Sequence, residues 1–466
     1  SAQFAHAITQ LGLAAGDRLA VQIEKSPDAL AVYCACVQSG VIFLPLNTAY
    51  TPSEVEYFIV NSGAKLVLCD QAKRQALQPF VHRLGAEIHA LNADGSGSFA
   101  DHAADKPTKF DTVERDIDDL AAFLYTSGTT GQSKGAMLTQ GNLLSNAQVL
   151  TKYWRFTASD TLLHALPIFH THGLFVATNV SLIAGGSMLF LPKFDMDAII
   201  ELLPMATTLM GVPTFYTRLL NDPRFTRELV GHMRLFVSGS APLLAETHMQ
   251  FEERTGHRIL ERYGMTETNM NTSNPYDGER RAGTVGFPLP GTELKITDPS
   301  TGSTLPEGEI GIIEVRGPNV FTGYWQMPEK TAEELRHDGF FITGDLGMID
   351  EDGYVHIVGR NKDLIISGGL NIYPKEIELV LDAQDGVLES AVIGVPHPDF
   401  GETPVGIIVA QQNTEPDLVA IKADLENALA RFKQPQKLIV LDELPRNTMG
   451  KVQKKALRER FADLFS

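Results

Sequence analysis

Residues 125–135 read Tyr-Thr-Ser-Gly-Thr-Thr-Gly-Gln-Ser-Lys-Gly, a segment rich in glycine and hydroxyl groups. Apolar runs flank it at 120–124 and 136–138, which predicts a loop between two strands. Glycine lets backbone N–H groups turn toward an anion, hydroxyls donate hydrogen bonds to phosphate oxygens, and Lys134 adds a positive charge. The segment therefore predicts a polyphosphate-binding loop rather than a flexible surface loop. It is not a Walker loop, because Gly135 and not serine or threonine follows Lys134.

The composition argues against several classes of protein. The chain has 466 residues, which is too many for one compact core. Its 57 acidic and 39 basic residues give a net charge of −18, which argues against nucleic acid or an anionic membrane as partner. No apolar run approaches the roughly 20 residues of a membrane helix. Cys34, Cys36 and Cys69 show no C-x-x-C spacing, so we expect no disulfide framework, no zinc site and a reducing, cytoplasmic location.

Strand and helix signals alternate in the first part of the chain. Residues 17–22 and 65–69 have the pattern of buried strands, and residues 26–40 have that of a helix that begins at Pro27. Such alternation predicts an α/β fold with a largely parallel sheet. The glycine- and serine-rich residues 93–105 predict a surface loop.

The pattern changes in the second half of the chain. Residues 283–350 are rich in glycine, proline and β-branched residues, which predicts a β subdomain. The polar segment 361–363 is the predicted domain boundary. We therefore expect a large N-terminal domain over residues 1–360, with parallel-rich sheets flanked by helices plus the β subdomain, and a small C-terminal α/β domain over residues 361–466.

Further motifs follow the loop in a fixed order. They are Tyr263-Gly-Met-Thr-Glu267, Thr343-Gly-Asp345, Gly359-Arg360 with Gly368-Gly369 and Pro374-Lys-Glu-Ile-Glu378, and Gly450-Lys451. Each could be structural when taken alone, but together with the loop they resemble the signature of the adenylate-forming superfamily. This superfamily contains acyl-CoA synthetases, luciferases and the adenylation domains of peptide synthetases. The resemblance implies ATP and Mg²⁺ as cofactors and covers the whole chain except for about 40 residues expected before Ser1, which leaves organellar targeting open.

The resemblance also implies roles for individual residues in ATP binding. Glu267 and Thr126 would hold Mg²⁺, Asp345 would accept from the ribose hydroxyls, and Lys451 would bridge the attacking carboxylate and the α-phosphate. The ATP-binding residues that it implies are Thr126, Ser127, Gly128, Thr129, Thr130, Gly131, Lys134, Gly239, Ser240, Ala241, Glu261, Tyr263, Gly264, Met265, Thr266, Asp345, Arg360 and Lys451. The catalytic residues that it implies are Lys451, Glu267, Thr126 and His172.

In the superfamily, the small domain moves between two half-reactions, and the second of these transfers the acyl group to the thiol of coenzyme A. Lys362 lies where the hinge residue falls, and Gly368 and Gly369 would then approach the CoA tunnel. An ordinary solvated linker lysine is the alternative for Lys362. Lys451 lies on a turn of the mobile domain, so we expect a lysine acetyltransferase and a deacetylase to reach it, and acetylation would remove its charge.

Several residues offer a clue to the acid that is activated. Arg218 and Arg262 lie in turns expected to wall the acyl pocket, with Ser240 between them. A buried arginine is rare without an anion, so two of them suggest a substrate with a second carboxylate. Thr171, His172 and Met270 suggest a small pocket. Two alternatives remain open: each arginine could pair with Glu261 or Asp277, and His170 and His172 could be structural histidines.

Longer runs resemble one branch of the superfamily, the malonyl-CoA synthetases. These runs cover residues 164–175, 210–220, 260–276 and 444–454. The resemblance implies malonate, ATP and CoA as substrates, and methylmalonate at reduced efficiency because it adds only a methyl group. The alternatives are a short-chain or aromatic acyl-CoA synthetase, a peptide-synthetase adenylation domain, and a nucleotide-binding protein that has lost catalysis.

Overall fold

Four β-sheets organise the chain in this computed structural model, which describes residues 1–126, 133–367, 370–412, 414–447 and 450–465. The first sheet has the order β4-β3-β1-β2-β5-β6 and is parallel except for the β5–β6 pair. Its strands are β1 (Arg18–Gln22), β2 (Ile42–Pro45), β3 (Leu66–Cys69), β4 (Glu87–Ala90), β5 (Leu120–Thr126) and β6 (Lys134–Thr139). The strands flanking the glycine-rich loop are thus confirmed as an antiparallel pair.

The second sheet has the order β13-β12-β11-β10-β9-β7-β8 and is parallel from β8 to β11. Its strands are β7 (Thr161–His164), β8 (Ser187–Phe190), β9 (Thr208–Gly211), β10 (Leu235–Ser238), β11 (Leu260–Met265), β12 (Asn269–Ser273) and β13 (Phe287–Pro288). Strands β9 and β10 are buried along their whole length, as expected of parallel strands covered on both faces. The carboxyl ends of these strands carry several of the predicted site residues.

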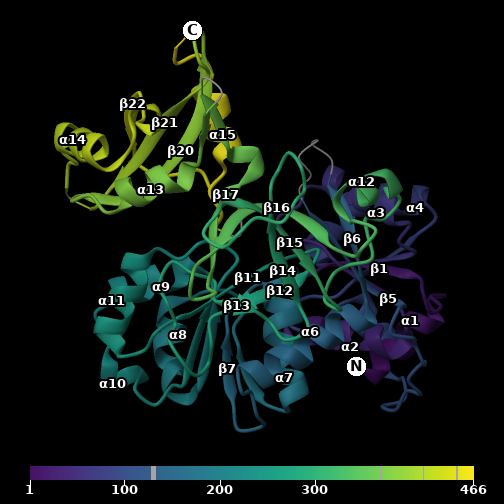
Figure 1. Cartoon of the computed structure of the whole chain (residues 1–466). Coiled ribbons are helices and arrows are strands. Elements are labelled where there is room, and N and C mark those ends of the chain that lie inside the picture. Colours follow the sequence, from purple (N-terminus) through teal and green to yellow (C-terminus); the bar gives the residue numbers. More distant parts are fainter. Residues whose placement is uncertain (127–132, 368–369, 413, 448–449, 466) are drawn as a thin grey trace.

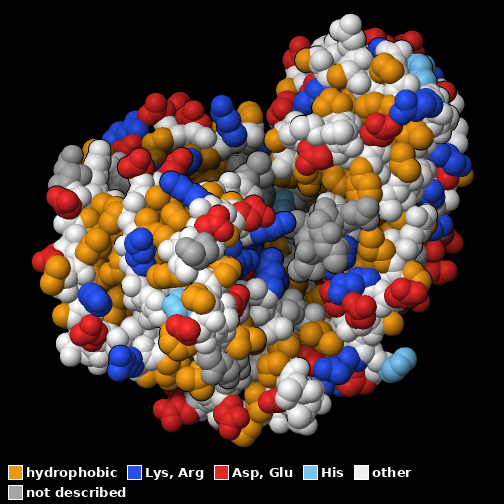
Figure 2. Space-filling view, turned by 90° about the horizontal axis from the view of Figure 1, so that it is seen from above, with side chains coloured by type: hydrophobic (Ala, Val, Ile, Leu, Met, Phe, Trp, Pro, Cys, Tyr) orange, Lys and Arg blue, Asp and Glu red, His pale blue; other side chains and the backbone are white. Residues whose placement is uncertain are grey.

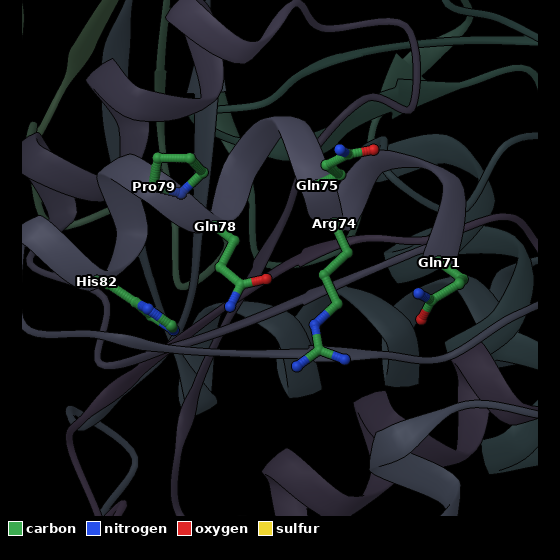
Figure 3. A pocket seen from close by; sticks show the side chains of 6 residues that line it. All are labelled: Gln71, Arg74, Gln75, Gln78, Pro79 and His82. Atoms are coloured by element: carbon green, nitrogen blue, oxygen red, sulfur yellow. The ribbon is translucent and has the colours of Figure 1, made fainter.

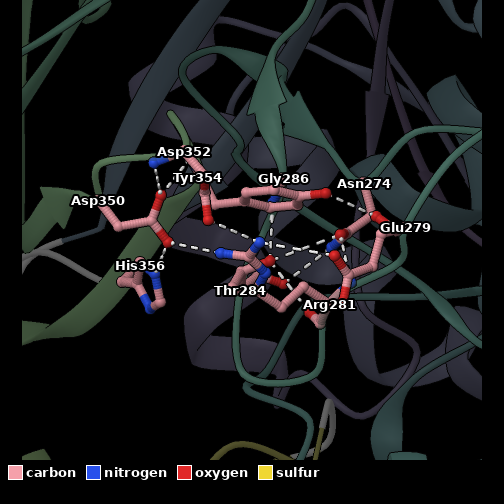
Figure 4. A network of polar contacts seen from close by, with 9 residues as sticks. All are labelled: Asn274, Glu279, Arg281, Thr284, Gly286, Asp350, Asp352, Tyr354 and His356. Carbon is pink, nitrogen blue, oxygen red and sulfur yellow. Dashed lines mark hydrogen bonds and ion pairs between the residues drawn. The ribbon is translucent and has the colours of Figure 1, made fainter.

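The third sheet is antiparallel and forms the predicted β subdomain. Its strands are β14 (Glu293–Thr297), β15 (Gly311–Arg316), β16 (Phe341–Ile349) and β17 (Val355–Arg360). A polar network around Arg281 ties the β16–β17 turn to the segment that precedes β13 (Figure 4). The guanidinium of Arg281 lies 3.1 Å from Asp350 and 2.9 Å from Asp352, and His356 Nε2 lies 2.8 Å from Asp350. This network holds in place the hairpin that bears Asp345 and Arg360.

The fourth sheet belongs to the small C-terminal lobe, which stands above the rest of the molecule in Figure 1. Its strands are β18 (Ile365–Ser367), β19 (Leu370–Ile372), β20 (Val387–His397), β21 (Gly401–Ala410) and β22 (Lys437–Leu441). A short helix, η3 (Asn361–Asp363), connects β17 to this lobe. The predicted domain boundary and hinge fall on η3, and the hinge role of this segment stays a prediction.

The helices cover the faces of the sheets, which confirms the predicted α/β fold class. Those of the large part are α1 (Ala2–Gln10), α2 (Pro27–Ser39), α3 (Pro52–Ser62), α4 (Gln71–Arg83), α5 (Ser98–Ala104), α6 (Gln140–Tyr153), the π-helix η1 (His172–Thr178), α7 (Asn179–Ala184), α8 (Met196–Leu202), η2 (Leu203–Met205), α9 (Pro213–Asn221), α10 (Arg227–Val230), α11 (Ala245–Thr255) and α12 (Pro328–Glu334). Those of the small lobe are α13 (Pro374–Asp382), α14 (Leu418–Ala428), η4 (Arg431–Lys433) and α15 (Lys454–Arg460).

The prediction of a surface loop over residues 93–105 holds for residues 93–97 and is wrong for residues 98–104, which form α5. Phe99 is fully buried, and its ring centroid lies 5.2 Å from that of Phe4 on α1. The burial of one aromatic side chain stabilises a short helix whose small polar neighbours favour a loop.

We predict that Thr139→Ala lowers the stability of the protein, because Thr139 caps α6. Its Oγ1 accepts from the N–H of Asn142 at 3.1 Å, and the Asn142 side chain accepts from the N–H of Thr139 at 2.9 Å. Loss of such a cap costs about 1 to 2 kcal/mol. Thermal unfolding followed by circular dichroism should show a lower Tm for Thr139→Ala and a nearly unchanged Tm for Thr139→Ser, which keeps the hydroxyl. Equal values of Tm for Thr139→Ala and the parent chain would contradict the role of this cap.

Candidate active site

The ends of the glycine-rich loop are well placed for a polyphosphate, and its centre lies outside the described residues. Ser127, Gly128, Thr129, Thr130 and Gly131 fall in that undescribed part. Thr126 and Lys134 face each other as a register pair at the open end of β5 and β6. Lys134 Nζ lies 3.2 Å from both carboxylate oxygens of Glu334 and 4.0 Å from the centroid of the Tyr324 ring. The lysine charge is thus held at the loop by an acid and an aromatic ring.

Glu267 lies beside this loop and is the best candidate for a metal ligand. It is 5% exposed, and burial raises the pKa of its carboxyl group. Its Oε1 accepts from the Tyr324 hydroxyl at 3.0 Å and lies 3.5 Å from Thr126 Oγ1. These hard oxygen donors fit Mg²⁺. The described residues contain no cluster of three His, Cys, Asp or Glu side chains for a metal ion, so most of the metal's ligands would come from phosphate and water.

Asp345 forms a second acidic position at the end of the β16–β17 ladder. It pairs in register with Arg360, whose Nε lies 2.6 Å from Asp345 Oδ1. The Tyr263 hydroxyl donates to Asp345 Oδ2 at 2.6 Å, and burial raises the pKa of that phenol. Asp345 thus lies at the junction of the second and third sheets and can still accept from ligand hydroxyls through its remaining lone pairs.

The turn after β10 lies close to β11, and the end of β11 lies close to β12. A Cβ atom on Gly239 would lie 2.3 Å from Cζ of Arg262, and a Cβ atom on Gly264 would lie 1.9 Å from the carbonyl oxygen of Asn269. Ser240 has a positive φ of 73°, which is uncommon for serine and often marks a functional turn. Ala241 follows Ser240 in the turn after β10, whereas Gly264 and Met265 are the last two residues of β11 and Thr266 begins the turn that follows it.

Arg262 is the unusual group of this site. It is 3% exposed, and its Nε and Nη2 atoms have no hydrogen-bond partner in the described part of the chain. Burial lowers the pKa of its guanidinium to about 9. Unpaired buried donors of a charged group cost several kcal/mol, which an incoming anion would offset. The geometry therefore provides an anion site at Arg262.

The histidine segment lies against this guanidinium. His172 Nδ1 lies 3.2 Å from Ser240 Oγ, whereas its Nε2 is buried and has no partner among the described residues. The pKa of His172 is lowered well below its usual value by burial first and by Arg262 second. The pKa of His170 is lowered to about 4 for the same two reasons. Thr171 Oγ1 is likewise buried and unpaired within the described chain, so this region offers several neutral donors and acceptors.

The alternative ion pairs of the two predicted arginines do not form in the described structure. Glu261 Oε1 accepts from the N–H of Leu243 at 3.0 Å, and its Oε2 has no partner among the described residues. Burial raises the pKa of Glu261 to about 8. Asp277 pairs with Arg155 instead of with Arg262. Glu261 therefore supports the turn after β10 and does not neutralise the guanidinium of Arg262.

The expectation that Arg218 is buried is wrong. Its side chain is exposed on α9, and its Cζ lies 5.4 Å from the centroid of the Phe194 ring. Arg218 shares a face of α9 with Thr214, one turn earlier, and Thr214 lies against Gly450 of the small lobe. Arg218 thus lies on the helix face that meets the small lobe. Met270, in contrast, is buried as expected, and its Cε would lie 2.6 Å from a Cβ atom on Gly264.

The small lobe brings Lys451 to the same region. Although this side chain is exposed, the surrounding protein displaces much of the water around it, and this desolvation together with Arg360 lowers the pKa of its ammonium to about 8. The charge of Lys451 also contributes to the lowered pKa of His170. Lys362 is exposed on η3, and Gly368 and Gly369 lie outside the described residues. Figure 2 shows Lys and Arg side chains gathered around a hollow on the face seen from the side of the small lobe.

Sequence reasoning missed Tyr324, Glu334 and Asn269. The hydroxyl of Tyr324 lies 3.0 Å from Glu267 and 2.6 Å from Glu334, and so links the candidate metal ligand to the partner of Lys134. Asn269 has a φ of 50°, and both polar atoms of its buried side chain have no partner in the described structure. The only signal for Asn269 was its place two residues after the Tyr263–Glu267 motif, and nothing local marked Tyr324 or Glu334.

Two hollows occur away from these residues. An open groove of about 550 Å³ follows the outer side of α4 and is lined by Gln71, Arg74, Gln75, Gln78, Pro79 and His82 (Figure 3). It contains none of the predicted site residues, and one helix supplies its whole lining, so it is not a candidate active site. A cavity of about 280 Å³ lies beyond the carboxyl ends of β1, β2, β7 and β8, and Lys25, Phe194 and Phe215 are part of its wall. Every helix in the described part of the chain is too short or too polar to cross a membrane.

Comparison with known proteins identifies the class. The model of the AMP-binding enzyme family matches residues 1–325, and the model of the AMP-binding enzyme C-terminal domain matches residues 376–451. The chain therefore belongs to the AMP-binding enzyme family, and its resemblance to the adenylate-forming superfamily is confirmed.

Within this family, the chain is similar to proteins that act on quite different acids. It is 35% identical to malonate–CoA ligase of Arabidopsis thaliana over 95% of this chain and 78% of that protein. It is 34% identical to feruloyl-CoA synthase of an Amycolatopsis species, over 99% and 92% of the two chains. The crystal structure of ATP-bound MatB from Rhodopseudomonas palustris has a TM-score of 0.98 and 59% identity, and the match covers 100% of this chain and 92% of that one.

We predict that Arg262→Met stabilises the ligand-free protein, because it removes a buried charge that forms no ion pair within the described residues. The expected gain is about 1 to 3 kcal/mol, seen as a higher Tm in a buffer free of carboxylates and phosphates. Arg224→Met is the matched control, since Arg224 is exposed and pairs with Asp222 and Asp197. The change for this control should stay within about 0.5 kcal/mol. A fall in Tm for Arg262→Met would show that Arg262 has a structural partner after all.

Proposed function

We propose that this chain is an AMP-forming malonate–CoA ligase. Malonate and ATP would give malonyl-adenylate and pyrophosphate, and the thiol of CoA would then displace AMP to give malonyl-CoA. The observation that carries the proposal is the buried guanidinium of Arg262, whose Nε and Nη2 have no partner in the described structure. The malonate–CoA ligase and MatB relatives support the same assignment.

In the first half-reaction, one anion attacks another, so the site must neutralise charge and align the reactants. Lys451 would bridge the attacking carboxylate of malonate and the α-phosphate. Lys134 and the hydroxyls of the glycine-rich loop would hold the leaving pyrophosphate. Lys134 would then bind phosphate in place of its present partner Glu334. Glu267 and Thr126 would hold Mg²⁺, which when bound neutralises phosphate charge.

The other nucleotide contacts follow from the same geometry. Asp345, fixed by Arg360 and Tyr263, would accept from the ribose hydroxyls. The turn of Gly239, Ser240 and Ala241 and the end of β11 at Gly264 would frame the adenine. Because Gly239 also packs against Arg262, nucleotide and acid would bind next to each other, as an in-line attack requires.

The second carboxylate of malonate would pair with Arg262, and His172, Ser240, Thr171 and Met270 would limit the size of the acid. Acetate would leave the buried guanidinium unpaired, which is a larger penalty than a missing methylene. Methylmalonate adds only a methyl group, so we expect weak acceptance. Arg218 would add positive charge from the exposed side of the pocket.

In the second half-reaction, the small lobe would rotate near Lys362. The rotation would withdraw Lys451 and bring the segment of Gly368 and Gly369 toward the bound CoA. The position of η3 between the last strand of the third sheet and the first strand of the fourth sheet supports this hinge. We also predict that acetylation of Lys451 stops adenylate formation, because it removes the positive charge of the lysine ammonium.

An aromatic or short-chain acyl-CoA synthetase is the main alternative, and the feruloyl-CoA synthase relative represents it. An acid without a second anionic group would have to cover Arg262 with apolar atoms. That arrangement leaves a desolvated charge without hydrogen bonds, which is unfavourable. A panel of acids therefore separates the two functions.

We predict strong malonate-dependent ATP–pyrophosphate exchange and CoA-dependent AMP release, reduced activity with methylmalonate, and little activity with acetate, succinate or a medium-chain acid.

Arg262→Ala should lower kcat/KM for malonate by about 10²- to 10³-fold and leave KM for ATP nearly unchanged, because it removes the partner of one carboxylate. Arg218→Ala should lower it by about tenfold, since Arg218 is exposed. Arg224→Ala is the control. If the chain is active with acetate and Arg262→Ala does not change this activity, the adenylation reaction still stands, but malonate is not the substrate.

We predict that adenylation loses activity as the pH rises through about 8. The pKa of Lys451 is lowered to about 8, so its ammonium is largely charged at pH 7 and loses its charge above pH 8. The kcat/KM for malonate in pyrophosphate exchange should then fall about tenfold per pH unit. Lys451→Arg should abolish this fall in kcat/KM at high pH, because arginine stays protonated in the tested range. If the same fall occurs in Lys451→Arg, another group is responsible for the titration.

A further inference from the structure

Lys25 is a buried lysine without an acidic partner in the described chain. It is 7% exposed and lies three residues after β1, in the wall of the 280 Å³ cavity. Its Nζ lies 2.9 Å from Nδ1 and 2.7 Å from the carbonyl oxygen of His164, and 4.2 Å from the centroid of the Phe190 ring. His164 and Phe190 are a register pair at the carboxyl ends of β7 and β8. The amine of Lys25 is therefore bound by one histidine.

The partners of His164 determine its tautomer. Its Nε2 lies 2.9 Å from the carbonyl oxygen of Gly173, which can only accept a hydrogen bond, so Nε2 carries the proton. Nδ1 is then the acceptor, and Lys25 donates to it. Burial and Lys25 lower the pKa of His164, which agrees with a neutral ring. Lys25 thus fixes the ring so that its Nε2–H is aimed at Gly173.

Gly173 is the second residue of the π-helix η1, and its carbonyl oxygen is tightly held. The Thr178 hydroxyl also donates to this oxygen, at 2.9 Å. A Cβ atom at Gly173 would lie 2.0 Å from the carbonyl oxygen of Pro167, so no other residue fits there. A π-helix is rare and is often found at functional sites. The first turn is therefore held by His164 from outside the helix and by Thr178 from the helix's own last residue.

The first turn of η1 forms part of the wall of the proposed acyl pocket. His172 directly precedes Gly173, and its Nδ1 lies 3.2 Å from Ser240 Oγ at the turn beside Arg262. A shift of the Gly173 carbonyl would carry the backbone of His172 with it. A series of contacts thus runs from Lys25 through His164 and Gly173 to His172.

We propose that Lys25 and His164 are positioning residues for the acid substrate. They touch no reactant; they hold the first turn of η1 so that His172 limits the pocket opposite Arg262. The inference rests on the proposed function, because it assigns to His172 a contact with the acid. Loss of the contacts from Lys25 and His164 to η1 should raise KM for malonate. It should leave KM for ATP unchanged, since the nucleotide contacts lie on other elements.

Two substitutions of His164 separate tethering from simple packing. The amide of glutamine can reach the position of Nε2 and donate to Gly173, whereas the shorter asparagine reaches only the position of Nδ1 and keeps the contact with Lys25. His164→Asn should raise KM for malonate about tenfold in pyrophosphate exchange, and His164→Gln should restore it to within about threefold of the parent value. Lys25→Met should act in the direction of His164→Asn. His248→Asn, at a buried histidine of α11, is the control.

Thermal unfolding and KM for ATP are measured for the same variants. A higher KM for malonate in His164→Asn than in His164→Gln, at similar Tm and similar KM for ATP, supports the proposal. Equal effects of the two variants on KM for malonate, or a parallel rise in KM for ATP, overturn it. If the parent chain shows no exchange with malonate, the proposed function fails. The same comparison, made with the acid that the parent does accept, then decides the role of His164 by itself.

Discussion

The buried positive charge of Arg262 is the constraint on which the rest of the site depends. A guanidinium that is 3% exposed and has unpaired donors in the described structure is costly to keep. The chain accommodates it by bringing the backbone of Gly239 so close that a Cβ atom would collide with Cζ. It also places the Ser240 backbone in the left-handed region, where its hydroxyl meets His172. One charge thus links β10, β11 and the π-helix.

Two other cations of the candidate active site differ from Arg262 in forming ion pairs. Lys134 pairs with Glu334 and lies over the Tyr324 ring, and Arg360 pairs with Asp345. These pairs keep positive charge at the proposed nucleotide region of a chain whose net charge is −18. An anion that binds to a paired cation gains less binding free energy than one that binds to an unpaired guanidinium, because it must replace an existing interaction. The difference fits a site that binds nucleotides generally and one acid selectively.

The strand–loop–strand at residues 120–139, the helix cap at Thr139 and the sheet classes could be predicted from the sequence, because each depends on neighbours in the chain. Helix α5 could not, since its stability comes from the contact of Phe99 with α1, nearly a hundred residues away. The roles of Tyr324 and Glu334 were missed for the same reason, because their partners Glu267 and Lys134 come from distant segments of the chain.

The sequence by itself determined the order of the motifs, the two-part α/β organisation and the family, because glycines, hydroxyls and charges at fixed local spacing limit the chemistry that a loop can perform. Only the tertiary structure decided which charges are paired. Arg218 and Arg262 look alike in the sequence, yet one is exposed on α9 and the other is buried on β11 against Gly239. Burial and the presence of a counter-ion depend on segments far apart in the chain, and the free energy of a charge depends on both.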